Sequence, residues 1–216
     1  MEGLEVREYN SDKKGITRLI IGGLHGREHY VIKKIFDSIK PSPSEGRVII
    51  IPNVDIFGKK YISTTSKDYI NSPAGRIYLS LLKHYKPDVV VELHVFKSKS
   101  YKNLVSHNRI HKKGVPRLVP YRADLPIEDQ ILHGGPAPFI KDKFKEHGSY
   151  ITLEVHERYG KEAENTLLFV LNSVINSNSV KEIRDKLKEK HKESMEEAAR
   201  LLQDYIEGEM NARDEP

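Results

Sequence analysis

Four short apolar runs, each bounded by turn-forming residues, constrain the fold of this chain more than any other feature of its sequence. Their length and their content of β-branched residues predict strands, and their continuous apolar character is typical of strands buried on both faces of a sheet. Segments with helical periodicity lie between and after them, at 28–40, 74–85, 136–148, 161–176 and 180–207. The four predicted strands are TRLIIGGL (17–24), RVIIIP (47–52), DVVVELHVF (88–96) and SYITLEV (149–155).

Strands that alternate with helices predict an α/β fold with a mixed, mostly parallel central sheet flanked by helices. No repeat or low-complexity linker divides the chain, so we expect one domain over residues 1–178. A charged amphipathic helix over 179–216 would then pack on this domain or associate with another copy of the chain. The N-terminus lacks a signal-peptide pattern, and no stretch has the ~18 consecutive apolar residues of a membrane span. We therefore expect a cytoplasmic protein with no membrane partner.

The 216 residues include no cysteine, which excludes disulfides, thiol nucleophiles and cysteine-based metal sites. The net charge of +5 is unevenly distributed. Residues 97–122 contain 8 basic residues and no acidic residue, whereas the chain after residue 180 is net acidic. This basic stretch, which we expect to be a loop, directly follows the third predicted strand.

Histidine and glutamate residues stand at the ends of three predicted strands. Ligands of open α/β sheets bind beyond the carboxyl ends of the strands. The first strand ends in GGLHGRE with His25 and Glu28, the third ends with His94, and the fourth contains Glu154. Two histidines and one carboxylate are a ligand set of catalytic zinc, which leaves a fourth position for water. Glu154 is then the candidate general base, because a carboxylate in an apolar strand is costly to bury without a role.

This ordered set resembles the zinc carboxypeptidase superfamily, and most closely its succinylglutamate desuccinylase/aspartoacylase branch. GGLHGRE (22–28), VVVELHV (89–95) and YITLEVHE (150–157) stand in the places and the order of that branch's three motifs, and IPNVDIFG (51–58) is similar to its Asn-Pro segment. The resemblance implies that His25, Glu28 and His94 bind one zinc ion per chain and that Glu154 is the general base. The chain is shorter than most enzymes of the branch, which suggests a small archaeal-type subfamily.

The chain departs from this pattern where the substrate would bind. The resembled branch has an Asn-Arg pair for the substrate carboxylate, and here Asn71 is followed by Ser72. A tyrosine also assists near the substrate in that branch, and Tyr150 and Tyr121 are the nearest equivalents. Five residues are candidates for contacting the substrate carboxylate, either as the retained asparagine or in place of the arginine: Asn71, Arg76, Lys59, Lys60 and Arg109.

The resemblance and the basic stretch together predict a zinc-dependent hydrolase of an amide bond next to a carboxylate, of the carboxypeptidase or N-acyl-amino-acid deacylase type. Its partner would be an anionic small molecule or a peptide C-terminus, attracted by the lysines and arginines of 97–122. The alternative is a metal-binding protein that keeps the fold without catalysis. We do not expect nucleic-acid binding, because the basic stretch contains only two aromatic residues and no recognition motif. HGGP (133–136) is typical of a lipase oxyanion loop, but no GxSxG pentapeptide accompanies it.

Overall fold

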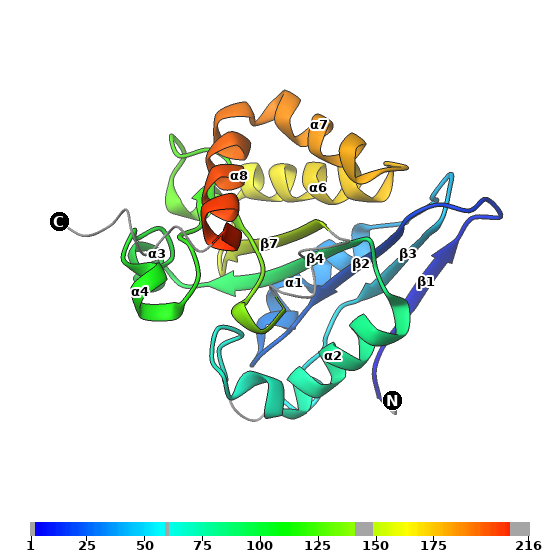
Figure 1. Ribbon diagram of the computed structural model, residues 1–216, viewed down its shortest axis with the longest axis horizontal. Coiled ribbons are helices and arrows are strands. Elements are labelled where there is room, and N and C mark those ends of the chain that lie inside the picture. The colour runs from blue at the N-terminus through cyan, green and yellow to red at the C-terminus, as the bar shows by residue number, and fades with distance from the viewer. Residues whose placement is uncertain (1–2, 59–60, 141–148, 208–216) are drawn as a thin grey trace.

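The computed structural model describes residues 3–58, 61–140 and 149–207, and its centre is a seven-stranded sheet with the order β1-β3-β2-β4-β7-β6-β5. Figure 1 shows this sheet with helices on both sides. The strands are β1 (Arg7–Asn10), β2 (Thr17–Gly22), β3 (Arg47–Ile51), β4 (Val89–Phe96), β5 (Val119–Pro120), β6 (Ile131–Gly134) and β7 (Ser149–His156). The helices are α1 (Glu28–Ser38), η1 (Tyr69–Asn71), α2 (Pro73–Tyr85), α3 (Ser98–Leu104), α4 (Arg109–Lys113), η2 (Ile127–Asp129), α6 (Lys161–Ile175), α7 (Val180–Lys190) and α8 (Lys192–Glu207).

The predicted mixed α/β sheet is confirmed. The four predicted strands form its parallel centre, where β2 pairs with β3 and β4, and β4 pairs with β7. The sequence did not reveal the three antiparallel strands, which are β1 at one edge of the sheet and β6 and β5 at the other end. These strands are short, and β1 (REYN) has only partly buried and exposed positions. They therefore lack the apolar run that marks a buried strand.

Alternate residues of the central strands face two separate apolar layers. Val89, Val91 and Leu93 of β4 belong to a core that α1, α6 and α7 complete, whereas Val90 belongs to a core on the side of α2. Figure 1 shows α6 and α7 on one side of the sheet and α2 on the other. Because side chains alternate along a strand, Glu92 and His94 point toward the side of α2.

The C-terminal segment differs from the single helix predicted for 180–207. The helix is broken at His191, which has the non-helical dihedral angles φ −133° and ψ 49°. The break gives the two halves different partners: α7 contacts α6 and places Ile183 and Leu187 in the core, whereas α8 contacts β5 and β6. One straight helix could not follow both the face and the edge of the sheet. The apolar positions along 180–207 have one helical period throughout, so they predicted a single helix and gave no sign of the break.

The basic stretch 97–122 is also more ordered than the expected loop, since it contains α3, α4 and β5. The polar helix faces are exposed, and Ile110 anchors α4 to an apolar cluster with Val115 and Tyr205. Most of the helix predicted for 136–148 lies outside the described residues. Within the described residues, no helix is both long enough and apolar enough to span a membrane.

Candidate metal centre

The turn between β2 and α1 places His25 and Glu28 beside the carboxyl ends of the central strands. Gly23 and Gly26 have positive φ angles of 56° and 66°, a conformation that glycine adopts without steric cost. The Asp55 carboxylate holds this turn by accepting a hydrogen bond from the Gly26 amide at 3.1 Å. Glu28 is the first residue of α1, so the turn delivers an imidazole and a carboxylate to one point.

His94, near the end of β4, completes a buried cluster with these two residues. One ligand atom from each of His25, Glu28 and His94 can be chosen so that all three lie within 4.8 Å of one another. Glu28 Oε1 lies 3.3 Å from His25 Nδ1 and 3.6 Å from His94 Nδ1. The two imidazole rings stack with their centroids 5.1 Å apart. The structure thus brings together the three residues that the sequence predicted as metal ligands.

The donor atoms of this cluster fit a cation. His25 Nδ1, His94 Nδ1 and Glu28 Oε2 are all buried and make no hydrogen bond. Buried polar atoms are normally hydrogen-bonded, and three unsatisfied atoms in one place need an explanation. Two imidazole nitrogens and a carboxylate oxygen are ligands of zinc, and manganese, iron and cobalt also accept such a set.

Outer contacts fix the orientation of two of the three side chains. Glu28 Oε1 accepts a hydrogen bond from the Val95 amide at 3.0 Å. On the far side of the His94 ring, Nε2 lies 3.4 Å from Glu92 Oε2, which leaves Nδ1 directed at the cluster. A carboxylate behind a ligating histidine is a common outer partner in metal sites, because it fixes the tautomer and the direction of the ring. Glu92 takes this place here.

Burial and mutual charge shift the three groups in different directions. Burial lowers the pKa of His25. Burial would by itself raise the pKa of Glu28, but the two histidines hold it below its ordinary value. For His94, burial opposes the charged form, yet the carboxylates of Glu28 and Glu92 raise its pKa well above the ordinary value. The two carboxylates therefore stabilise positive charge on His94, whereas burial keeps His25 neutral.

Glu154 of β7 stands directly opposite His94 of β4 in the parallel register of the sheet. Residues paired in this way point to the same face, so the Glu154 side chain lies on the side of the metal cluster. Burial raises the pKa of Glu154 to about 7, although the charge of His94 acts in the other direction. A carboxylate with a pKa near neutrality can both accept and release a proton at physiological pH.

Arg109 and Tyr61 complete the surroundings of the cluster. The positive charge of Arg109, at the start of α4, lowers the pKa of Glu154, so this arginine lies within electrostatic reach of the site. One of its nitrogens donates to the Pro116 carbonyl at 2.6 Å. The Tyr61 ring lies edge-on to His25, with centroids 4.4 Å apart, and 66% of the residue is exposed. No pattern in the sequence marks Tyr61, because it lies in an irregular segment ten residues after the end of β3.

Three other predicted substrate contacts have local partners of their own, and two lie outside the described residues. Arg76 is exposed and donates to the Asn71 carbonyl at 2.6 Å, and Asn71 is itself exposed. Tyr121 is buried and stacks on His133 with centroids 4.0 Å apart. The candidates Lys59 and Lys60 lie outside the described residues.

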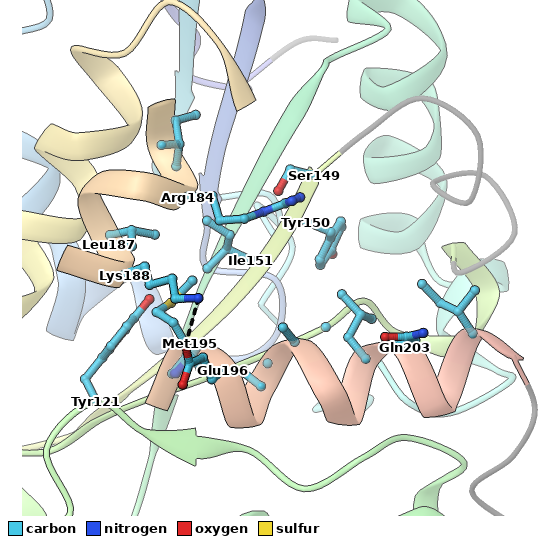
Figure 2. Close-up of a pocket in the computed structure, with 18 residues that line it drawn as sticks. Tyr121, Ser149, Tyr150, Ile151, Arg184, Leu187, Lys188, Met195, Glu196 and Gln203 are labelled. Atoms are coloured by element: carbon cyan, nitrogen blue, oxygen red, sulfur yellow. Dashed lines mark ion pairs between the residues drawn. The ribbon is translucent and has the colours of Figure 1, made fainter. Parts of the chain in front are cut away.

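Tyr150 is buried, and its hydroxyl shares a hydrogen bond of 2.6 Å with the hydroxyl of Tyr78. Figure 2 shows Tyr150 beside a hollow of about 430 Å³, which lies between β7 and the helices α7 and α8. Leu187 and Met195 line that hollow, and Lys188 at its edge is paired with Glu196 at 2.8 Å. None of the three predicted metal ligands borders it.

The chain is similar to three solved structures at low identity. An aspartoacylase family protein from Mesorhizobium loti has a TM-score of 0.45 at 15% identity, with 82% of this chain and 63% of that chain covered. Succinylglutamate desuccinylase/aspartoacylase from Rhodobacter sphaeroides has a TM-score of 0.44 at 15% identity, with 81% of this chain and 61% of that chain covered. A metallo-carboxypeptidase from Pseudomonas aeruginosa has a TM-score of 0.43 at 11% identity, with 79% of this chain and 61% of that chain covered. The chain thus spans about three fifths of the length of these proteins.

Two matches cover nearly the whole chain. A protein of Methanocaldococcus jannaschii, "Uncharacterized protein MJ0501", is 31% identical over 209 residues, which are 95% of this chain and 98% of that protein. Residues 13–207 match the family described as "Uncharacterized protein conserved in archaea (DUF2119)". These matches are consistent with the archaeal-type subfamily that the sequence suggested, and the chain belongs to this archaeal family.

Proposed function

We propose that the protein is a zinc-dependent hydrolase of an amide bond next to a carboxylate, of the deacylase or carboxypeptidase type. The observation that carries this proposal is the buried group of His25, Glu28 and His94, whose unsatisfied atoms converge while Glu154 faces them from the neighbouring strand. One zinc ion per chain would supply Lewis-acid polarisation of a carbonyl and acidify a water molecule.

The side chains around the cluster have distinct roles in this proposal. Glu154 takes the proton of the attacking water and delivers it to the leaving amine, a transfer for which a pKa of about 7 is well matched. Arg109 binds the substrate carboxylate, because a guanidinium forms strong charge-assisted hydrogen bonds with carboxylates. Glu92 holds the His94 ring in place from behind. The substrate is an anionic small molecule or a peptide C-terminus.

The test is Glu154→Gln in the zinc-loaded protein. The variant should retain the zinc of the wild type, measured by elemental analysis, because Glu154 is not one of the three ligands. Its turnover of N-acyl amino acids and short peptides should fall at least ~1,000-fold, within the range expected for loss of a general base. Retained hydrolysis in the variant would remove Glu154 from the mechanism. Zinc binding by a wild type that hydrolyses nothing would favour the metal-binding protein without catalysis.

Arg109→Ala and Arg76→Ala form a matched pair for the substrate carboxylate. We expect Arg109→Ala to raise KM about tenfold or more, since a hydrogen bond to a charged group contributes roughly 1.5–3 kcal/mol. Arg76 is exposed on α2 and, unlike Arg109, is not among the charges that act on the pKa of Glu154, so Arg76→Ala should leave KM unchanged. Steady-state kinetics of both variants on one substrate shows which arginine binds the substrate carboxylate. A raised KM in Arg76→Ala with an unchanged KM in Arg109→Ala would assign the carboxylate to Arg76.

A further inference from the structure

A hollow of about 310 Å³ opens beside His25, between the turn that follows β2 and the start of α2. Its walls include the apolar side chains of Leu24, Phe57, Ile62 and Ala74. Its volume is at the lower end of the range for ligand sites, so it has room for one substituent of a substrate. A molecule bound at the cluster could extend this substituent past His25.

Ser72, which follows Asn71 in the sequence, forms part of the wall of this hollow. Its hydroxyl donates to the Tyr69 carbonyl at 2.6 Å and accepts from the Gly75 amide at 3.0 Å. The second contact caps the N-terminus of α2, a common role for serine. The Ser72 hydroxyl is thus already engaged within the protein.

Two further polar side chains of the wall, Tyr69 and Asp55, are engaged in the same way. The Tyr69 hydroxyl donates to the Leu24 carbonyl at 2.9 Å. The Asp55 carboxylate accepts from the amides of Gly26 and Gly58, at 3.1 Å and 2.9 Å. Asp55 is only 7% exposed, and its negative charge repels any second carboxylate placed in the hollow.

We infer that this hollow binds an apolar, uncharged substituent on one side of the scissile amide and rejects an acidic one. This inference rests on the proposed function, because it assigns a subsite to the same centre. The carboxylate of the substrate then lies toward Arg109, on the side of Glu154, and the apolar group lies past His25. Substrates that carry a carboxylate on both sides of the amide are excluded.

The inference can be tested with two zinc-binding hydroxamates of similar size, pentanohydroxamate and succinyl monohydroxamate. Calorimetry measures binding to the zinc-loaded protein, both in the wild type and in Arg109→Ala. The variant removes the attraction between Arg109 and the succinyl carboxylate, so its affinities report the effect of the hollow alone. In Arg109→Ala, pentanohydroxamate should bind about 100-fold more tightly, because burial of an unpaired carboxylate is strongly unfavourable. Shortening its chain by one methylene should weaken binding about fourfold.

Ile62→Trp fills the hollow and should remove this preference. Ile77→Trp is the matched control, because Ile77 is also partly buried beside the core on the side of α2 but does not border the hollow. The control should keep the preference of the wild type. If zinc is bound and succinyl monohydroxamate binds equally well in Arg109→Ala, the apolar subsite is wrong and the proposed hydrolase survives. If the protein binds no zinc, both are wrong.

Discussion

Two pairs of buried histidines in this molecule have opposite surroundings. His25 and His94 are 7% and 2% exposed and face the carboxylate of Glu28. His133 and His191 are 4% and 6% exposed and lie where β6 meets the break between α7 and α8. Burial alone therefore does not distinguish a candidate metal centre from a structural cluster.

The second pair is surrounded by aromatic rings and a hydroxyl group. His133 Nε2 lies 2.6 Å from Ser194 Oγ, and the His133 ring stacks on Tyr121. His191 packs against the rings of Tyr121 and Phe169, and neither of its ring nitrogens has a hydrogen-bond partner. Unsatisfied nitrogens occur in both pairs, but in the described chain only the first pair combines with a carboxylate into a group that could hold a metal.

The carboxylates beside the first pair give one of its histidines a pKa shift that neither histidine of the second pair has. Burial and the neighbouring His191 lower the pKa of His133 to about 3, whereas carboxylates raise that of His94. Burial among aromatic rings thus keeps His133 neutral, whereas the carboxylates stabilise the positive charge of His94. The carboxylates of Glu28 and Glu92 place negative charge beside the first pair, which favours a bound cation there.

The largest expected effect comes from His94→Ala compared with His133→Ala. Removal of one of the three protein ligands should weaken zinc binding roughly 100- to 1,000-fold, since a full set of four ligands provides about 10–16 kcal/mol. Competition with a chelating dye measures this change. His133→Ala, an equally buried control, should keep the zinc affinity of the wild type. Equal loss in both variants would mean that the two histidine pairs do not differ in metal binding.

A smaller effect is expected from Glu92→Gln, which keeps the shape of the side chain but removes its charge. Zinc affinity should fall ~10- to 100-fold, the usual range for an outer partner of a ligating histidine. Glu157→Gln is the control, because this glutamate is near the end of the same sheet but is partly exposed and pairs with Lys97. The same dye competition serves for both variants. An unchanged affinity in Glu92→Gln would show that His94 does not depend on the carboxylate behind it.

The smallest effect concerns acid stability and the second pair. The pKa of His133 is about 3 in the folded protein, whereas its ordinary value is 6.5, so between these values only the unfolded chain binds the proton. The contribution to stability is therefore present above about pH 6.5 and is lost as the pH falls toward 3, by at most ~1.4 kcal/mol per pH unit. Urea unfolding at pH 7 and pH 5 measures this slope in the metal-free protein.

His133→Phe preserves an aromatic ring in this position but cannot titrate. Loss of the contact with Ser194 lowers the stability of this variant at every pH, so the slope between pH 7 and pH 5 is the informative quantity. We expect a shallower slope in the variant than in the wild type. Identical slopes would mean that His133 takes up a proton in the folded protein as readily as in the unfolded chain.

Local sequence patterns predicted the centre of the fold and the position of the first histidine pair. The apolar runs that became β2, β3, β4 and β7 are buried on both faces, and such strands need no tertiary information to be recognised. Parallel strands align their carboxyl ends, so polar residues at those ends were expected to meet. Edge strands and the break at His191 were missed, because they depend on which surface each segment packs against.

The sequence by itself determined which residue types can carry the chemistry: with no cysteine, only imidazole and carboxylate ligands remain, and GGLHGRE and ELHV supply three of them. The tertiary structure decided which polar residues meet. The register of β4 and β7 set Glu154 opposite His94, and α4 brought Arg109 near them. The Ser72 hydroxyl caps α2 by accepting from the Gly75 amide. The sequence offered five candidate contacts for the substrate carboxylate, and only the packing of α4 places one of them, Arg109, within electrostatic reach of Glu154. Such contacts join residues distant in the chain, so they depend on register and packing, which no local pattern records.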